Sequence, residues 1–317
     1  MAAEEQDNMD DVQADDLRYD VVCYGTISIE NVTRLSHLPT PKRDAMASHE
    51  HDELGGEALN VALPLAWWGL RVAVVGNFIG ADRKADFIKA ELADFPLIDT
   101  SYITQHPNVV TPFTRVLVTP DGERSRIAYW YEQTPKDELL SSVMAQARVL
   151  SVDAYGKDER DRAAKLARDL GKTVVSSDAI WPQYPLASHS DVVVISSAWL
   201  QTNFPGVYEY DHALDLQSRG AGVIIITDGS RPVLVVRADG SPFGVEPYTV
   251  RRVVDTSGAG DIFKAGIIYA WMQEGWPLEQ KVKFACAAAG LGCEVDRSKQ
   301  PMPSLSDIHA LMRAQPR

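Results

Sequence analysis

The chain has 317 residues, of which 45% are hydrophobic and 24% charged, and its formal net charge is −13. This composition is typical of a globular protein with one large domain, and the acidic balance argues against nucleic-acid and membrane partners. The three cysteines form no CxxC pair and no apolar run reaches transmembrane length, so we expect a cytoplasmic protein with reduced thiols.

Residues 1–17 open the chain as an acidic segment without hydrophobic periodicity or an apolar targeting core, which predicts a disordered tail. A later polar stretch, residues 33–53, contains His49-Glu50-His51. These side chains could bind a metal, but alternate residues on a loop or edge strand are more often solvated, and we assign no metal site there.

From residue 18 onward, strand-like and helix-like segments alternate. Short runs of apolar, mostly β-branched residues are typical of buried parallel strands, and apolar residues at helical spacing follow several of them. This alternation predicts a mostly parallel sheet with right-handed crossovers. The predicted strands are 19–24, 71–76, 149–152, 173–177, 191–195, 223–227, 232–236 and 247–254, and the predicted helices are 55–69, 80–94, 158–170, 210–219, 259–273, 278–290 and 306–312.

Residues 112–119 and 125–131 interrupt this rhythm, because both alternate with a period of two. The turn Pro120-Asp121-Gly122 joins them, which is a hairpin signal. We expect this hairpin to lie outside the central sheet and, with residues near 33–53, to form a small β lid that excludes water from a site. An edge hairpin without a moving role is the alternative.

The stretch Val254–Phe263 combines a predicted strand end, a glycine-rich turn and the start of a helix. Gly258 and Gly260 let a ligand approach the main chain, and the first helical amides lack intrahelical acceptors in the field of the helix dipole. These features predict an anion site suited to phosphate. Asp261 can accept a proton from a nearby hydroxyl group, so the stretch fits phosphoryl transfer to an alcohol. The alternative is a Ser/Gly turn in which Asp261 only stabilises the dipole.

Two motifs about two hundred residues apart raise the specificity of this interpretation. The first is Gly55-Gly56-x-x-x-Asn60-x-Ala62, followed by an apolar helix and Gly69. The second is Asp255-Thr256-x-Gly258-Ala259-Gly260-Asp261-x-Phe263-x-Ala265-Gly266. Together they resemble the signatures of the PfkB, or ribokinase-like, carbohydrate kinases, and the resemblance extends from about residue 19 to about residue 308.

The resemblance implies a ribokinase-like three-layer α/β/α fold over residues 18–317, with a mostly parallel central sheet and a small β lid. It also implies transfer of the γ-phosphoryl group of ATP to a hydroxyl of a sugar or sugar-like acceptor. By the same resemblance, Asp261 is the general base beside the anion-binding amides of Gly258, Ala259 and Gly260. The implied acceptor-binding residues are Glu30, Gly55, Gly56 and Asn60. The resemblance also implies that the nucleotide contacts Thr227 and Gly229, and that a monovalent cation lies near Asp255 and Ser257.

The chain departs from the family pattern at three places. Glu30 stands where the family usually has an Asp, and its longer side chain alters the acceptor pocket. The family's Asn-x-x-Glu segment should fall within Ile195–Leu200, which contains neither residue, so we expect Mg²⁺ to be held through water or by Asp178. The late glycine of the cation loop is replaced around Asp296-Arg297-Ser298, which leaves the binding of K⁺ open.

The leading interpretation is an active sugar kinase that uses ATP and Mg²⁺. A nucleoside kinase of the same fold, or a non-catalytic relative that binds a sugar or a partner protein, are the alternatives. The intact Asp261 motif favours catalysis. A dehydrogenase and a P-loop kinase are disfavoured because neither G-x-G-x-x-G after the first strand nor Walker A is present. Lid strands could pair between two copies to give a homodimer, or the protein could be a monomer.

Overall fold

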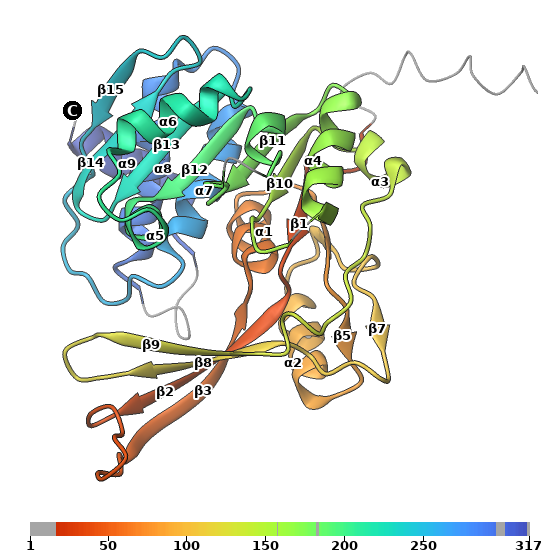
Figure 1. The fold of residues 1–317 in the computed structure, drawn as a ribbon, viewed down its shortest axis with the longest axis vertical. Coiled ribbons are helices and arrows are strands. Elements are labelled where there is room, and N and C mark those ends of the chain that lie inside the picture. Colours follow the sequence, from red (N-terminus) through yellow and green to blue (C-terminus); the bar gives the residue numbers. More distant parts are fainter. Residues whose placement is uncertain (1–16, 157, 182–183, 296–301, 316–317) are drawn as a thin grey trace, which may run out of the picture.

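The computed structural model describes residues 17–156, 158–181, 184–295 and 302–315. A nine-stranded sheet forms its centre (Figure 1), with the strand order β15-β14-β13-β12-β11-β10-β1-β4-β6. The pairs from β6 to β13 are parallel, and β14 and β15 join antiparallel at one edge. The strands are β1 (Val21–Gly25), β4 (Val72–Gly76), β6 (Ile98–Asp99), β10 (Val149–Val152), β11 (Thr173–Ser177), β12 (Val192–Ser196), β13 (Val223–Asp228), β14 (Arg231–Val236) and β15 (Pro242–Val245).

Helices cover both faces of this sheet and enclose two separate cores. In β1, Val21 and Cys23 belong to one core and Val22 and Tyr24 to the other, because alternate residues of a strand point to opposite faces. The first core is covered by α1 (Glu57–Trp67), α7 (Ala259–Trp271), α8 (Leu278–Gly292) and α9 (Leu305–Ala314), together with α2 (Arg83–Leu92). The second is covered by α3 (Ser141–Ala145), α4 (Asp158–Asp169), α5 (Ser197–Asn203) and α6 (Glu209–Ser218). The predicted three-layer α/β/α arrangement is confirmed.

A second sheet of four strands projects from the body (Figure 1), and we call it the lid. Its order is β3-β2-β8-β9, in which β2 and β8 run parallel and the other pairs antiparallel. The lid thus consists of two hairpins from separate parts of the chain; the sequence predicted the second of them and only a contribution from residues near 33–53 to the first. Its strands are β2 (Ser28–Leu35), β3 (Ala47–Gly55), β8 (Phe113–Val118) and β9 (Arg124–Tyr129), and the short β5 (Ile79–Gly80) and β7 (Gln105–His106) pair elsewhere.

The strand predicted at 247–254 is wrong. This segment runs beside the ends of α8 and α9, where its backbone groups find partners other than a strand. The Val254 amide donates to the Cys293 carbonyl at 2.8 Å, and the side chain of Gln315 bonds both the amide and the carbonyl of Thr249. The edge strand is instead β15, which forms a hairpin with β14.

Three further sequence expectations concern the N-terminal tail, the segment around residue 296 and membrane-spanning helices. Leu17, assigned to the disordered tail, is buried in the body. The rest of that tail and Asp296-Arg297-Ser298 lie outside the described residues. Within the described residues, no helix has both the length and the apolar character needed to cross a bilayer.

Candidate active site

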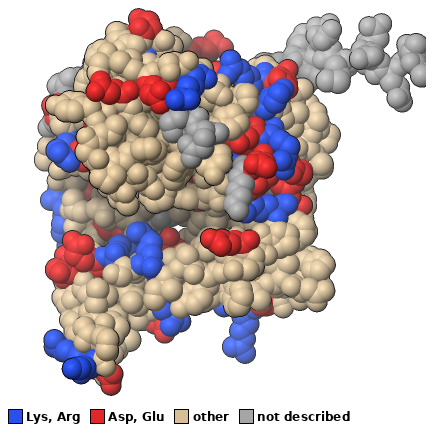
Figure 2. Space-filling model, in the orientation of Figure 1, with Lys and Arg blue, Asp and Glu red and all other residues tan. Residues whose placement is uncertain are grey.

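A cleft of about 990 Å³ lies between the lid and the carboxyl ends of the central strands (Figure 2). It brings together the two motifs, which are far apart in the sequence. Three predicted site residues do not line the cleft: Gly55, Gly229 and Asp255. The predicted site residues that line the cleft are Glu30, Gly56, Asn60, Thr227, Ser257, Gly258, Ala259, Gly260 and Asp261.

The first turn of α7 presents backbone donors to this cleft. Gly258 caps the helix in the left-handed conformation, with a φ of 64°, which favours glycine. Among the described residues, the amides of Gly258 and Gly260 have no protein acceptor, whereas the Ala259 amide donates to the Thr256 carbonyl at 3.3 Å. The hydroxyl oxygen of Ser257 is buried there without a hydrogen-bond partner in the described structure. These donors fit an anionic group, with Ala259 the weakest of the three amides predicted.

The two motifs meet at a hydrogen bond between helices α1 and α7. Asn60 Nδ2 donates to Asp261 Oδ2 at 2.8 Å, across 201 positions of sequence. Gly56 lets the start of α1 lie against the Thr26 backbone, because its φ is 85° and an added Cβ would lie 2.3 Å from the Thr26 carbonyl oxygen. The sequence predicts a contact between Asn60 and the acceptor, and the structure gives this amide the additional role of orienting the carboxylate of Asp261.

A buried ion pair connects the same two helices. Lys264 Nζ donates to Glu57 Oε1 at 2.6 Å and to the Val152 carbonyl at 2.9 Å, and the Ser177 hydroxyl also donates to Glu57 Oε1. The side chains of Lys264 and Glu57 are 1% and 7% exposed. Burial raises the pKa of Glu57 to about 8, and the Lys264 ammonium opposes that rise. Because Glu57 precedes Asn60 by one turn and Lys264 follows Asp261 by one turn, the pair fixes the register of the two helices beside the cleft.

The base of the lid holds residues that the sequence predicts to bind the acceptor. Glu30 on β2 lines the cleft together with Thr114 on β8, whose hydroxyl is 2.8 Å from the Tyr131 hydroxyl. Gly55 does not line the cleft, and its small size serves Glu30, since an added Cβ would lie 2.8 Å from Glu30 Cγ. The structure therefore gives Gly55 a packing role, and its contact with the acceptor stays a prediction.

An ion pair joins the lid to the loop before α7. Arg124 on β9 donates to Asp255 Oδ1, which also accepts the Ser257 amide at 2.7 Å. The two charged side chains are only 17% and 11% exposed. Asp255 Oδ1, expected near a monovalent cation, is thus already occupied by two donors, and we assign no cation to it. Alternation along 124–128 was the sequence signal that could have placed Arg124 in the cleft.

Comparison with known sequences identifies the family. Residues 18–305 match the sequence model described as pfkB family carbohydrate kinase. The chain belongs to the pfkB carbohydrate kinase family. It is therefore a phosphotransferase whose acceptor is an alcohol group.

Three curated relatives illustrate the range of this pfkB family. The chain is 24% identical to the nucleoside kinase of Methanothermobacter thermautotrophicus, covering 93% of this chain and 96% of that protein. It is 23% identical to the ketohexokinase of Mus musculus, covering 86% and 95% of the two chains. It is also 23% identical to the 5-dehydro-2-deoxygluconokinase of Clostridium beijerinckii, covering 93% of each.

Solved structures of pfkB relatives share the fold. Arabidopsis thaliana ribokinase complexed with ribose and ATP superposes with a TM-score of 0.80 at 21% identity, covering 94% of this chain and 99% of that one. A ribokinase II from E. coli in complex with ATP and Mg²⁺ superposes with a TM-score of 0.74 at 16% identity, covering 94% and 100%.

The place where a pfkB kinase is expected to hold Mg²⁺ has an unusual composition here. Among the described residues no cluster of three His, Cys, Asp or Glu side chains could cage a metal ion. Asp178 is the carboxylate at the end of β11, where its Oδ1 accepts the Ser196 amide and its Oδ2 accepts the Tyr155 hydroxyl at 3.2 Å. Burial raises the pKa of Asp178. Trp199 occupies the segment without Asn-x-x-Glu and packs edge-on against Tyr155. Such a site fits Mg²⁺ only if phosphate oxygens and water supply most ligands.

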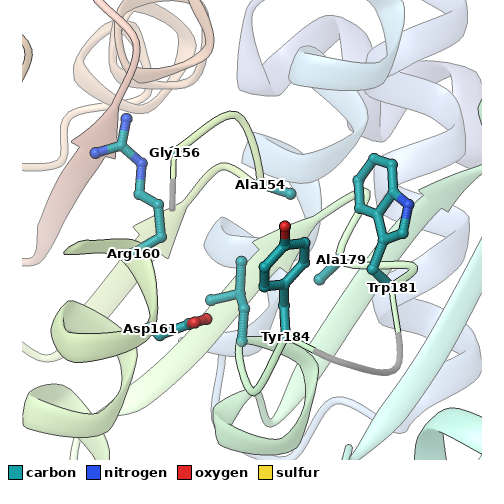
Figure 3. A pocket seen from close by; sticks show the side chains of 8 residues that line it. Ala154, Gly156, Arg160, Asp161, Ala179, Trp181 and Tyr184 are labelled. Carbon is teal, nitrogen blue, oxygen red and sulfur yellow. The ribbon is translucent and has the colours of Figure 1, made fainter. Parts of the chain in front are cut away.

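A second cavity lies on the α4 side of the sheet (Figure 3). It has a volume of about 20 Å³, so it has room for roughly one water molecule and not for a nucleotide or a sugar. Figure 3 shows Trp181 and Tyr184 on one side, and Arg160 and Asp161 of α4 on the other. Arg160 Nε donates to Asp153 at 2.8 Å, which makes this side chain part of the framework. The cleft under the lid is the site that fits the family's substrates.

Replacement of Arg124 should loosen the lid. We expect Arg124→Ala to speed hydrogen exchange of the β8 and β9 amides about tenfold, because a partly buried charged hydrogen bond contributes roughly 1.5–3 kcal/mol. Exchange followed by mass spectrometry measures this directly. Arg115→Ala is the matched control, since Arg115 lies on the opposite face of the lid and is 3.9 Å from Glu50 with both side chains about half exposed. Equal exchange in the two variants would show that the Asp255 pair does not hold the lid.

Proposed function

We propose that this protein transfers the γ-phosphoryl group of ATP to a hydroxyl group of a sugar, with Asp261 as the general base. The observation that carries the proposal is the hydrogen bond from Asn60 to Asp261 beside the amides of Gly258 and Gly260. A base held in a fixed orientation next to an anion site is what phosphoryl transfer to an alcohol requires.

In this mechanism the acceptor hydroxyl lies against Asp261, and its proton passes to the carboxylate. The acceptor oxygen then forms a bond to the γ-phosphorus as the bond to the β,γ-bridging oxygen breaks, which releases ADP. Gly258 and Gly260 donate their amides to the transferred group, and the α7 dipole stabilises its negative charge. The lid excludes water, which would otherwise compete as the acceptor.

The nucleotide would lie toward the ends of β12 and β13, where Thr227 lines the cleft and Gly229 turns the chain with a φ of 57°. Mg²⁺, when bound, neutralises the phosphate charge, and Asp178 is the carboxylate we assign to it, directly or through water. We assign no step to K⁺. Pairing of two copies through the lid strands stays a prediction.

Two other functions compete with this one. A nucleoside kinase is supported by the name of the archaeal relative, whereas ketohexokinase and 5-dehydro-2-deoxygluconokinase favour a sugar-like acceptor. A non-catalytic binding protein has little use for a base held by Asn60, which favours catalysis.

A panel of sugars, sugar acids, sugar phosphates and nucleosides, tested with ATP and Mg²⁺ in a coupled ADP assay, separates these functions. We expect turnover with at least one sugar derivative and much less with nucleosides. Turnover confined to nucleosides would replace the sugar-kinase proposal. Stabilisation of the protein by a sugar without ADP release from any acceptor would support the binding function instead.

A further inference from the structure

Arg126 is a cationic side chain in the cleft that phosphoryl transfer does not use. Arg124, Arg126 and Ala128 of β9 all line the cleft, because alternate residues of a strand face the same side. Arg124 is bound to Asp255. Arg126 is exposed and forms no hydrogen bond or ion pair with any residue that the structure describes.

The strand register places Arg126 on the acceptor side of the Arg124–Asp255 pair. Ala128 pairs with Thr114, and Thr114 pairs with Glu30, so these three residues form one row across the lid at the predicted acceptor end. Residues two apart on a strand are separated by about 7 Å. Arg126 therefore lies one step from this row, with the small Ala128 beside it leaving room for a ligand. Basic side chains on the lid border the hollow in Figure 2.

Four further acidic side chains line the cleft, and in the described residues none of them forms an ion pair with Arg126: Glu30, Glu123, Asp178 and Asp261. Other charges already have partners. Glu57 is paired with Lys264, Asp255 with Arg124, and the transferred phosphoryl group has the α7 amides. A neutral polyol bound under the lid would remove water from Arg126 without supplying a counter-charge, and such desolvation is unfavourable. An acceptor with its own negative charge would compensate Arg126.

We infer that the acceptor is a sugar derivative that carries a carboxylate or phosphate group, and that Arg126 binds this group. The guanidinium fork matches either oxyanion with two parallel hydrogen bonds, and the reacting hydroxyl lies at the Asp261 end of the same molecule. Arg126 is thus a specificity-determining residue. The inference rests on the proposed kinase function and adds the substrate class to it.

Matched acceptors test this inference, with kcat/KM measured for aldoses, the corresponding aldonic acids and the corresponding sugar phosphates. We expect the wild type to prefer one of the two anionic series, and whether it is the acids or the phosphates identifies the anionic group. Arg126→Gln should lower the ratio of anionic to neutral kcat/KM by about tenfold to a hundredfold. Arg126→Glu should lower it further, because the reversed charge repels the anion. Arg115→Gln, on the other face of the lid, is the control and should leave the ratio unchanged.

The outcomes separate this inference from the kinase proposal. Turnover that favours neutral sugars, or a ratio that Arg126→Gln leaves unchanged, overturns the inference while the kinase function stands. If Arg126→Gln raises only the KM for ATP, the inference is overturned as well, since Arg126 would then bind the nucleotide. If no acceptor is phosphorylated, the kinase proposal fails, and the melting temperature then tests whether Arg126 binds an anionic sugar. A rise in melting temperature with anionic sugars that Arg126→Gln removes supports this binding. No such rise overturns the inference.

Discussion

Asp261→Asn should lower kcat for phosphoryl transfer by about a thousandfold, with little change in the KM for the acceptor. The substitution keeps the shape of the side chain and an oxygen that can accept from Asn60 Nδ2, so the site should remain assembled. What it removes is the carboxylate that receives the proton of the acceptor hydroxyl. Steady-state kinetics and a melting curve of the purified variant measure both effects.

The control for this substitution is Asp307→Asn. Asp307 lies in the first turn of α9, as Asp261 does in α7, but it does not line the cleft. If Asp261 only stabilised the helix dipole, both variants would lose a little stability and keep their activity. A variant Asp261→Asn with more than about a tenth of the wild-type kcat would exclude Asp261 as the base.

Lys264→Met should destabilise the fold by about 3–5 kcal/mol, because it leaves the Glu57 carboxylate buried without its counter-charge. Chemical denaturation of the variant and the wild type measures this difference. The loss should depend on pH. Burial raises the pKa of Glu57 to about 8 even with Lys264 present, so the variant can recover by taking up a proton. A carboxyl group with a raised folded-state pKa stabilises the fold at low pH and loses that contribution as the pH rises. The deficit should therefore be larger near pH 9 than near pH 6.

Two variants sharpen this prediction. The double variant Glu57→Gln with Lys264→Met removes both charges and should be more stable than Lys264→Met alone. Lys165→Met breaks an exposed pair with Asp169, in which both side chains are about 60% exposed, and should cost under about 0.5 kcal/mol. Equal losses from Lys264→Met and Lys165→Met would mean that the Glu57 pair does not stabilise the two helices.

The sequence predicts this fold well where a pattern has one structural solution. The strands β10 and β11 match their predicted bounds because their apolar runs have the length and the β-branched content of buried strands. The lid hairpin follows from its period of two and its Pro-Asp-Gly turn. Residues 247–254 have a similar composition, but their amides bond distant groups: the Thr249 amide donates to Gln315 and the Val254 amide to the Cys293 carbonyl. No local sequence pattern indicates these partners.

The same reason limits what the sequence says about the site. The anion-binding turn is local, so its glycines and Asp261 could be located from ten residues. Lys264 lies within an apolar helical pattern that gives no sign of an ion pair, because its partner Glu57 lies 207 residues upstream. Arg124 and Arg126 enter the cleft only because two separate hairpins join into one lid.

The sequence distance between Asn60 and Asp261 also sets the order in which a newly made chain can complete its catalytic centre. At a synthesis rate of roughly 5–20 residues per second, the 201 positions that separate Asn60 from Asp261 take about 10–40 s to translate. Until α7 leaves the ribosome, α1 lacks the helix that covers its core, and Glu57 lacks the ammonium that neutralises it. A nascent chain that stops before residue 264 therefore cannot bury this carboxylate with its ionic partner, and the site forms only when about the last fifth of the protein arrives.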